Sequence, residues 1–278
     1  AYTFVVRAAS GEGSYTARDA ILFPRDPLRN APQIFSDLRR VFPPTAGRHV
    51  VGPMVQLRWG SPTLLTLDLA LLVELPAPIR VIVLGRLQVL LPDQSHPLVQ
   101  IRMDALGVLD LSAETVALDA TLYDSRILQF TLTGDMALRA GWGRQPQFVL
   151  AIGGFHPRFA PPPGLPALQR LALQLADGDS LQLRCQAYLA VTSNTVQFGA
   201  RVDLHAAGGG FSFDGMLGFD AILQLAPLAF EVEVGAALAL RYRGRLLLGV
   251  SFTGRLAGPT PWQVAGKAKI KLLFFSVS

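Results

Sequence analysis

One loop rich in glycine and proline carries the residues whose types and spacing best suit chemistry. Residues 153–159 read Gly-Gly-Phe-His-Pro-Arg-Phe, and four more prolines follow by residue 166. A histidine two residues before an arginine on a rigid loop, His156 and Arg158, could form a binding or catalytic element. The alternative is structural: both side chains hydrogen-bond backbone groups and hold a chain reversal. We favour the structural role.

Two further pairs of polar residues share a strand face. Asp203 and His205 lie two residues apart, as do Glu231 and Glu233. A carboxylate pair can flank a glycosidic bond. On so regular a face, Glu231 and Glu233 are better interpreted as solvated charges. They could pair across strands with the basic rows Arg241–Arg245 or Lys267–Lys271.

The sequence predicts no metal site and no cofactor. The four histidines lie far apart, and no His-x-x-x-His or Cys-x-x-Cys spacing occurs. The single cysteine, Cys185, lies on the apolar side of its strand and is interpreted as a small apolar side chain rather than a nucleophile. Because one cysteine cannot form an internal disulfide, the fold fits a reducing compartment, which slightly favours a cytoplasmic location.

The heptapeptide Gly153–Phe159, followed by prolines and then a leucine-rich amphipathic strand, resembles a motif in a family of uncharacterised bacterial and fungal proteins, domain of unknown function 6603. The resemblance implies no activity. The long strands also resemble the β-groove of bridge-like lipid transfer proteins in style, without a shared motif.

Composition narrows the classes of function. Half of the residues are hydrophobic and 16% are charged, whereas soluble domains carry about 25% charged residues. The net charge is +5, and the only lysines are Lys267, Lys269 and Lys271. Because basic residues are not interleaved with aromatics on one face, we expect no nucleic-acid binding. A transmembrane helix needs about 20 consecutive apolar residues, and because no apolar run approaches that length, none is expected.

The pattern of hydrophobicity changes at residue 50. Residues 1–49 predict a strand at 1–8, a polar loop, and a capping helix at 30–42 that ends at two prolines. From residue 50 apolar and polar residues alternate, which is typical of strands with one buried face. Strands are predicted at 53–59, 63–75, 79–91, 98–111, 114–123, 127–140, 147–153, 168–175, 181–191, 195–205, 211–225, 228–240, 245–256 and 262–274. In the strands at 63–75 and 79–91 large apolar residues interrupt the polar side, which predicts strands covered on both faces; they are Leu64, Leu72, Ile82, Leu84 and Leu90.

We therefore expect an all-β protein: a long antiparallel meander that forms a curved open sheet or a large two-sheet sandwich, with one short N-terminal helix. A front half at 50–152 and a back half at 167–278 meet at a rigid loop at 153–166, and we expect one continuous unit rather than separate domains. The strand-like ends of the chain suggest a piece of a longer polypeptide.

The abundance of apolar side chains on one strand face leads to the first functional hypothesis. It is non-enzymatic binding or carriage of lipid or another long apolar ligand in a β-lined groove. The predicted lining residues are Leu128, Phe130, Leu132, Val196, Phe198, Val202, Phe211, Phe213, Phe230, Ile270 and Phe274. The alternative is a structural or assembly domain whose apolar faces are core and whose edge strands pair with neighbouring domains or subunits. A third hypothesis is an enzyme of unknown type at the His156 loop.

Overall fold

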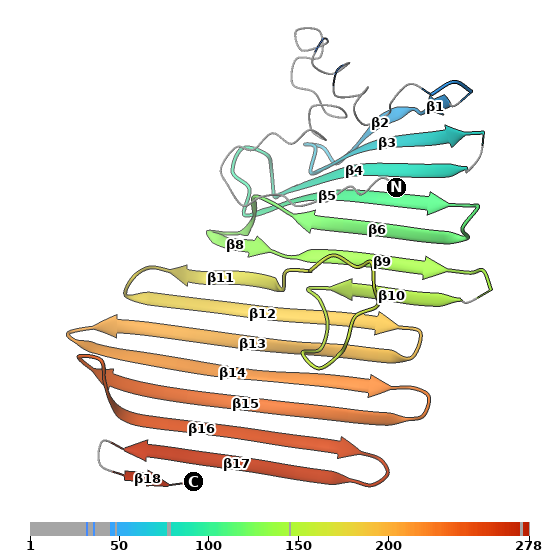
Figure 1. Ribbon diagram of the computed structural model, residues 1–278. Helices are drawn as coiled ribbons and strands as arrows, with labels where there is room; N and C mark the ends of the chain where they lie inside the picture. The colour runs from blue at the N-terminus through green and yellow to red at the C-terminus, as the bar shows by residue number, and fades with distance from the viewer. Residues whose placement is uncertain are drawn as a thin grey trace.

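Eighteen strands form one sheet in the part of the chain that the structure describes (Figure 1). The computed structural model describes residues 45–47, 49–76, 79–144, 146–272 and 275–277, together with Pro32 and Ser36. The predicted strand at 1–8 and, apart from Pro32 and Ser36, the predicted helix at 30–42 lie outside these residues. The all-β antiparallel fold predicted from the alternation is confirmed, and the strands lie in a single open sheet.

The strands of the front half differ in length, with short pieces where the sheet is interrupted. They are β1 (His49–Val51), β2 (Met54–Trp59), β3 (Leu65–Leu75), β4 (Arg80–Leu91), β5 (Val99–Asp110), β6 (Thr115–Leu122), β7 (Ser125–Ile127), β8 (Phe130–Thr133), β9 (Asp135–Gly141) and β10 (Gln147–Ile152).

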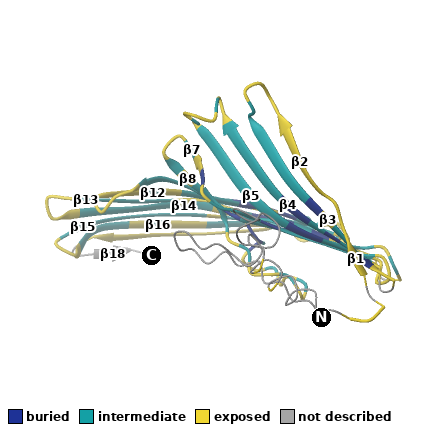
Figure 2. Ribbon diagram, turned by 90° about the horizontal axis from the view of Figure 1, so that it is seen from above, coloured by how far each residue is buried: buried dark blue, intermediate teal, exposed yellow. Residues whose placement is uncertain are grey.

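The back half contains the longest strands, of which four consecutive ones have 14 residues each. They are β11 (Leu171–Asp177), β12 (Leu181–Thr192), β13 (Thr195–Gly208), β14 (Phe211–Gln224), β15 (Ala229–Tyr242), β16 (Arg245–Gly258), β17 (Gln263–Leu272) and β18 (Phe275–Val277). The strands β2–β5 are turned relative to β13–β16, so the sheet is strongly twisted (Figure 2), as extended sheets of L-residues are.

One predicted strand, at 127–140, is wrong as a single element. Its residues form parts of three strands, β7, β8 and β9. Leu128 has a φ of 57° and lies in the turn between β7 and β8, while Gly134, with a φ of 155°, separates β8 from β9. The apolar alternation continues across both breaks, and for this reason the sequence pattern did not reveal them.

Three rows of the sheet hold two strands end to end. β6 and β7 both pair with β5, and β9 and β8 form the next row. In the third row β10 and β11 pair with successive parts of β12. The chain leaves this row after Ile152 and re-enters it at Leu171, so the loop is longer than predicted. We call residues 153–170 the crossing loop.

The two faces of the sheet differ in chemistry. We call the side that carries the crossing loop the loop face, and the opposite side the apolar face. In the back half the loop face presents rows such as Tyr188, Gly199, Asp220, Glu233 and Arg255, which are successive cross-strand partners. Directly beside it, the apolar face presents the row Leu189, Phe198, Ala221, Val232, Leu256 and Val264.

Seven buried side chains form a row on the loop face. Its members are successive cross-strand partners from β3 to β13, and the row also includes Asp119 of β6, which is partly exposed. The buried members are Ala70, Leu84, Leu106, Ala137, Ala151, Ala190 and Gln197. Ile82 joins this row in the core cluster, and Leu72 packs against it. Of the residues that interrupt the polar side of these strands, Ile82 and Leu84 are therefore core residues of the loop face, and Leu72 packs against them.

Candidate functional site

The crossing loop leaves the sheet through two glycines. Gly153 and Gly154 have φ angles of 70° and 90°, a conformation that favours glycine. The N–H of Gly153 still donates to the carbonyl of Asp135, at 2.8 Å, so the chain turns away from the sheet within one residue. The loop then passes over the face of β12 and β13 (Figure 1).

Arg170 fixes the base of the loop. Its guanidinium donates to the carbonyl oxygens of Gly153, at 3.1 Å, and Phe155, at 2.8 Å. The same group lies 3.9 Å from the centroid of the Tyr188 ring, a cation–π contact. The Tyr188 hydroxyl donates to Asp220 Oδ1 at 2.8 Å. Burial, together with the Asp220 carboxylate, raises the pKa of Tyr188, so this hydroxyl stays protonated.

His156 is almost fully buried, with 2% of its surface exposed. Its backbone N–H donates to Gln197 Oε1 at 3.0 Å, and its ring Nδ1 accepts from the backbone N–H of Arg158 at 3.2 Å. The proton of the neutral ring is therefore on Nε2, which is buried and has no hydrogen-bond partner among the described residues. Burial lowers the pKa of His156. These contacts hold a tight turn, which Phe159 N–H closes by donating to the His156 carbonyl.

Arg158 ties the tip of the loop to β15, on the far side of β14. Its guanidinium forms ion pairs with Glu231 and Glu233, the latter at 2.6 Å. Arg255 on β16 also contacts Glu231, at 2.7 Å. The two glutamates thus pair with the loop and with Arg255, whereas the sequence suggested Arg241–Arg245 or Lys267–Lys271 as their partners.

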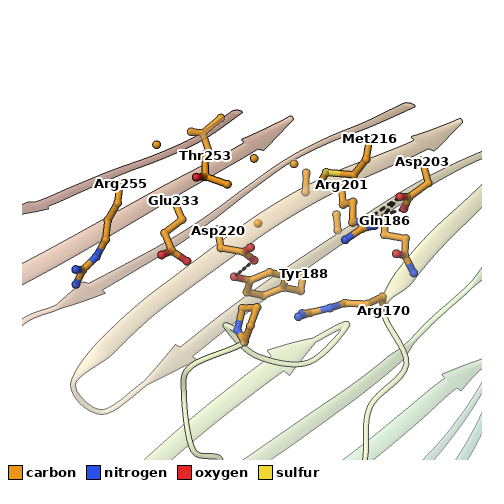
Figure 3. A pocket seen from close by; sticks show the side chains of 18 of the residues that line it. Arg170, Gln186, Tyr188, Arg201, Asp203, Met216, Asp220, Glu233, Thr253 and Arg255 are labelled. Atoms are coloured by element: carbon orange, nitrogen blue, oxygen red, sulfur yellow. Dashed lines mark hydrogen bonds and ion pairs between the residues drawn. The ribbon is translucent and has the colours of Figure 1, made fainter. Parts of the chain in front are cut away.

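The loop shelters a polar hollow of about 750 Å³ on the loop face (Figure 3). The hollow forms where Gly218 on β14 pairs directly with Gly235 on β15, because neither glycine has a side chain that would fill the space above the sheet. Pro157 of the loop borders it on one side. The charged and polar side chains around it are Arg170, Gln186, Tyr188, Arg201, Asp203, Asp220, Glu233, Thr253, Arg255 and Lys267.

The side chains of Asp203 and His205 pair with different partners. Asp203 forms a two-pronged ion pair with Arg201, whereas His205 Nδ1 lies 2.6 Å from Asp214 Oδ1. The hydrogen bond from His205 and the charge of Arg241 lower the pKa of Asp214. Among the described residues no group of three or more His, Cys, Asp or Glu could hold a metal ion.

The predicted lining residues share one face of the sheet, with two exceptions. Leu128 lies in the β7–β8 turn, and Phe274 lies outside the described residues. The register places the other nine on the apolar face: Phe130, Leu132, Val196, Phe198, Val202, Phe211, Phe213, Phe230 and Ile270. Cys185 lies on this face as well, between Leu173 and Val202. The 750 Å³ hollow lies on the opposite, loop face.

Sequence reasoning missed Arg170, Tyr188 and Asp220. One signal was available, because Tyr188 is the one aromatic on the polar side of 181–191, where Gln182, Arg184 and Gln186 are its neighbours. An aromatic at such a position indicates that something covers it. Its partners Arg170 and Asp220 lie in other strands or loops, and only the register brings them together.

The family assignment adds to this geometry. A family model described as a family of unknown function, DUF6603, matches residues 14–278. The chain belongs to the DUF6603 family. No curated protein and no solved structure matches this DUF6603 chain. Within its described residues, no helix is long and apolar enough to cross a membrane.

Acidification is expected to destabilise this DUF6603 chain in part through His156. In the folded chain the pKa of His156 lies below its ordinary value of about 6.5. As the pH falls, His156 therefore binds a proton in the unfolded chain before it does so in the folded chain. The contribution to stability is complete above pH ~6.5 and is lost as the pH falls through the folded pKa. One such group changes the free energy of unfolding by at most about 1.4 kcal/mol per pH unit.

Urea unfolding at a series of pH values measures this slope. In the His156→Gln variant the free energy of unfolding should depend less steeply on pH below pH ~6.5. The matched control is His96→Gln, which removes an exposed histidine outside the loop. An unchanged slope in His156→Gln would show that His156 does not titrate differently in the two states.

Proposed function

We propose that the chain is a non-enzymatic protein that binds or carries lipid, or another long apolar ligand, along the apolar face of β12–β17. One observation carries the proposal: a continuous face of aliphatic and aromatic side chains is exposed in the described structure. Leu217 is 59% exposed, and Phe198 and Phe252 are each 45% exposed. Exposed apolar area of this extent is typical of a surface that binds a partner.

The chemistry of the face suits an acyl chain. The register places leucine, valine, phenylalanine, alanine and glycine there in row after row, and Cys185 is the one weakly polar side chain of β12 on this side. A ligand on such a face needs no hydrogen bonds. Each methylene that leaves water contributes about 0.8 kcal/mol, and less where only one side of the chain is covered.

The dimensions also suit an extended ligand. The four strands β13–β16 have 14 residues each, which makes them roughly 45 Å long at about 3.3 Å per residue. A lipid could therefore lie along a strand or across several strands without leaving the apolar face. The groove predicted from the sequence is part of this proposal, formed by the twist of the sheet and the side chains named above.

Native mass spectrometry of protein purified without detergent, with extraction of bound lipid, tests the proposal. We expect near-stoichiometric lipid on the wild-type chain. A variant with Val202→Thr, Leu217→Gln and Phe252→Gln alters one row of the apolar face. It should retain at least about tenfold less lipid, which corresponds to about 1.4 kcal/mol.

The control for this variant is Met216→Gln, which alters the loop face of the same strand. Because the three altered side chains are exposed, stability should change little, within about 1 kcal/mol in urea unfolding. Lipid-free wild-type protein, or equal lipid on the variant and the wild type, would refute the proposal.

A second candidate is a structural or assembly domain in which another sheet covers the apolar face. The observation that favours it is the exposure of every residue of β2 and β17, the strands near the two edges of the sheet. Sheets that pack face to face lie about 10 Å apart and bury such faces against each other. Sedimentation would then show concentration-dependent assembly without ligand, and the three-residue variant would abolish it.

A further inference from the structure

The basic charge of the chain is concentrated at one edge of the sheet. Residues 234–278 contain seven Lys and Arg and no acid, whereas residues 1–233 contain the other eighteen and all twenty acids. The net charge is therefore −2 over residues 1–233 and +7 over residues 234–278. The basic residues of the segment 234–278 lie on β15, β16 and β17 or in the turns between them.

Several of these cations have partners within the sheet. Arg241 pairs with Asp214, Arg255 pairs with Glu231, and Arg243 lies over the ring of Tyr242. The three lysines are placed differently. They lie two residues apart on one side of β17, opposite Thr253, Ser251 and Gly249 of β16, so no acid faces them across this described pairing: Lys267, Lys269 and Lys271.

The other side of the same strand is apolar. Val264 is 82% exposed, and Ile270 and Leu272 are about half exposed. Trp262, directly before the strand, is 64% exposed. Every residue of β17 is exposed, and within the described part of the chain β18 pairs only with residues 270–272, which leaves residues 263–269 at the edge of the described sheet. β17 therefore combines a basic side and an apolar side at this edge of the described sheet.

We propose that β17 docks the protein on an anionic membrane surface. Trp262 and Val264 enter the interface, and the three lysines bind the phosphate and carboxylate groups of the lipids. Indole rings are favoured at membrane interfaces because one end is apolar and the other polar. Lysine side chains are long enough to lie along apolar surface while the ammonium group reaches headgroups. The inference rests on the proposed function, because the bilayer is the source of the lipid.

Two other roles for the lysines are less well supported. Lysines on an edge strand prevent pairing with other strands, but that role requires neither an exposed Trp262 nor an apolar opposite side. Single-stranded nucleic acid binds basic surfaces on which aromatic side chains stack with the bases. The lysine side of β17 holds only Gln263 and Ala265 besides the lysines, so charge complementarity favours an anionic bilayer.

Flotation of the full chain with lipid vesicles tests this inference. The vesicles contain phosphatidylcholine alone, or phosphatidylcholine with phosphatidylserine. Wild-type protein should bind the anionic vesicles more tightly, and added salt should weaken the binding. A variant with Lys267→Gln, Lys269→Gln and Lys271→Gln should bind them about 100-fold more weakly at low salt. Trp262→Ala should weaken binding without changing its dependence on salt.

The matched control loses three exposed arginines elsewhere, through Arg126→Gln, Arg144→Gln and Arg184→Gln. It should bind anionic vesicles within a few-fold of the wild type, although its net charge equals that of the lysine variant. Equal binding by the lysine variant and the wild type, equal loss in the control, or lysine-dependent binding of an oligonucleotide without vesicle binding would each overturn the inference. Circular dichroism of both variants checks that the sheet is retained.

The same samples separate the inference from the proposed function. Retained lipid without a preference for anionic vesicles would leave the carrier proposal in place and refute docking through β17. Lysine-dependent vesicle binding by a chain that retains no lipid would support docking and refute the carrier proposal.

Discussion

Replacement of Gly153 with alanine is expected to lower the free energy of unfolding by roughly 3 kcal/mol or more, since it combines a backbone clash with a strained φ. A Cβ at this position would lie 2.6 Å from the carbonyl oxygen of Ala187 and 2.7 Å from the nitrogen of Leu171. Both are backbone atoms of paired strands, so neither can move without disturbing the sheet. The left-handed φ of 70° adds a cost of about 1 kcal/mol for any residue with a side chain.

Gly164 provides a matched control in the same loop. Its φ is 84°, but a Cβ there would meet nothing within 4 Å. Gly164→Ala should therefore cost only the conformational part, about 1 kcal/mol. Urea unfolding of both variants measures the difference. Similar losses in both would mean that the loop does not fit closely against β11 and β12 at Gly153.

Truncation of Leu84 to alanine is expected to cost about 3 kcal/mol, since large-to-small changes of buried leucines cost about 2–5 kcal/mol. Leu84 is 6% exposed and lies in the core cluster on the loop face, between Ala70 and Leu106. Leu217→Ala on the apolar face should cost less than about 1 kcal/mol, because much of that side chain already contacts water.

The comparison of these two leucines determines which face of the sheet is covered. Urea unfolding of both variants at low protein concentration, without lipid, gives the two losses. A loss of about 3 kcal/mol in Leu217→Ala as well would mean that another layer buries the apolar face in solution. That result would favour the assembly domain over the lipid carrier.

The anchoring of the crossing loop explains why its histidine need not act in a reaction. Gln197, Arg158 and the buried surroundings hold His156 in a neutral form with one nitrogen committed to the loop backbone. The His156 contact with the loop backbone agrees with the structural role favoured from the sequence, but the Arg158 side chain pairs with Glu231 and Glu233 rather than with backbone groups. A binding role for the loop at the neighbouring hollow stays a prediction.

The order of apolar and polar residues is enough to predict the strands and their two-sided chemistry. Alternation at a period of two along a whole strand leaves it one apolar and one polar side, whatever its neighbours are. Short links rich in Gly, Asp and Asn then favour antiparallel hairpins, such as the turn between β12 and β13 at Ser193 and Asn194. The 127–140 segment failed because alternation continues through Leu128 and Gly134, where only φ reveals the breaks.

How these strands combine is visible only in the folded chain. Alternation is the same in one open sheet and in a sandwich, because it records which side is apolar but not what covers it. The loop site also depends on register: Arg158 meets Glu231 and Glu233, which lie much later in the chain, and Tyr188 meets Asp220 across β13. Such contacts depend on strand pairing over long sequence separations, and no local residue pattern encodes that pairing.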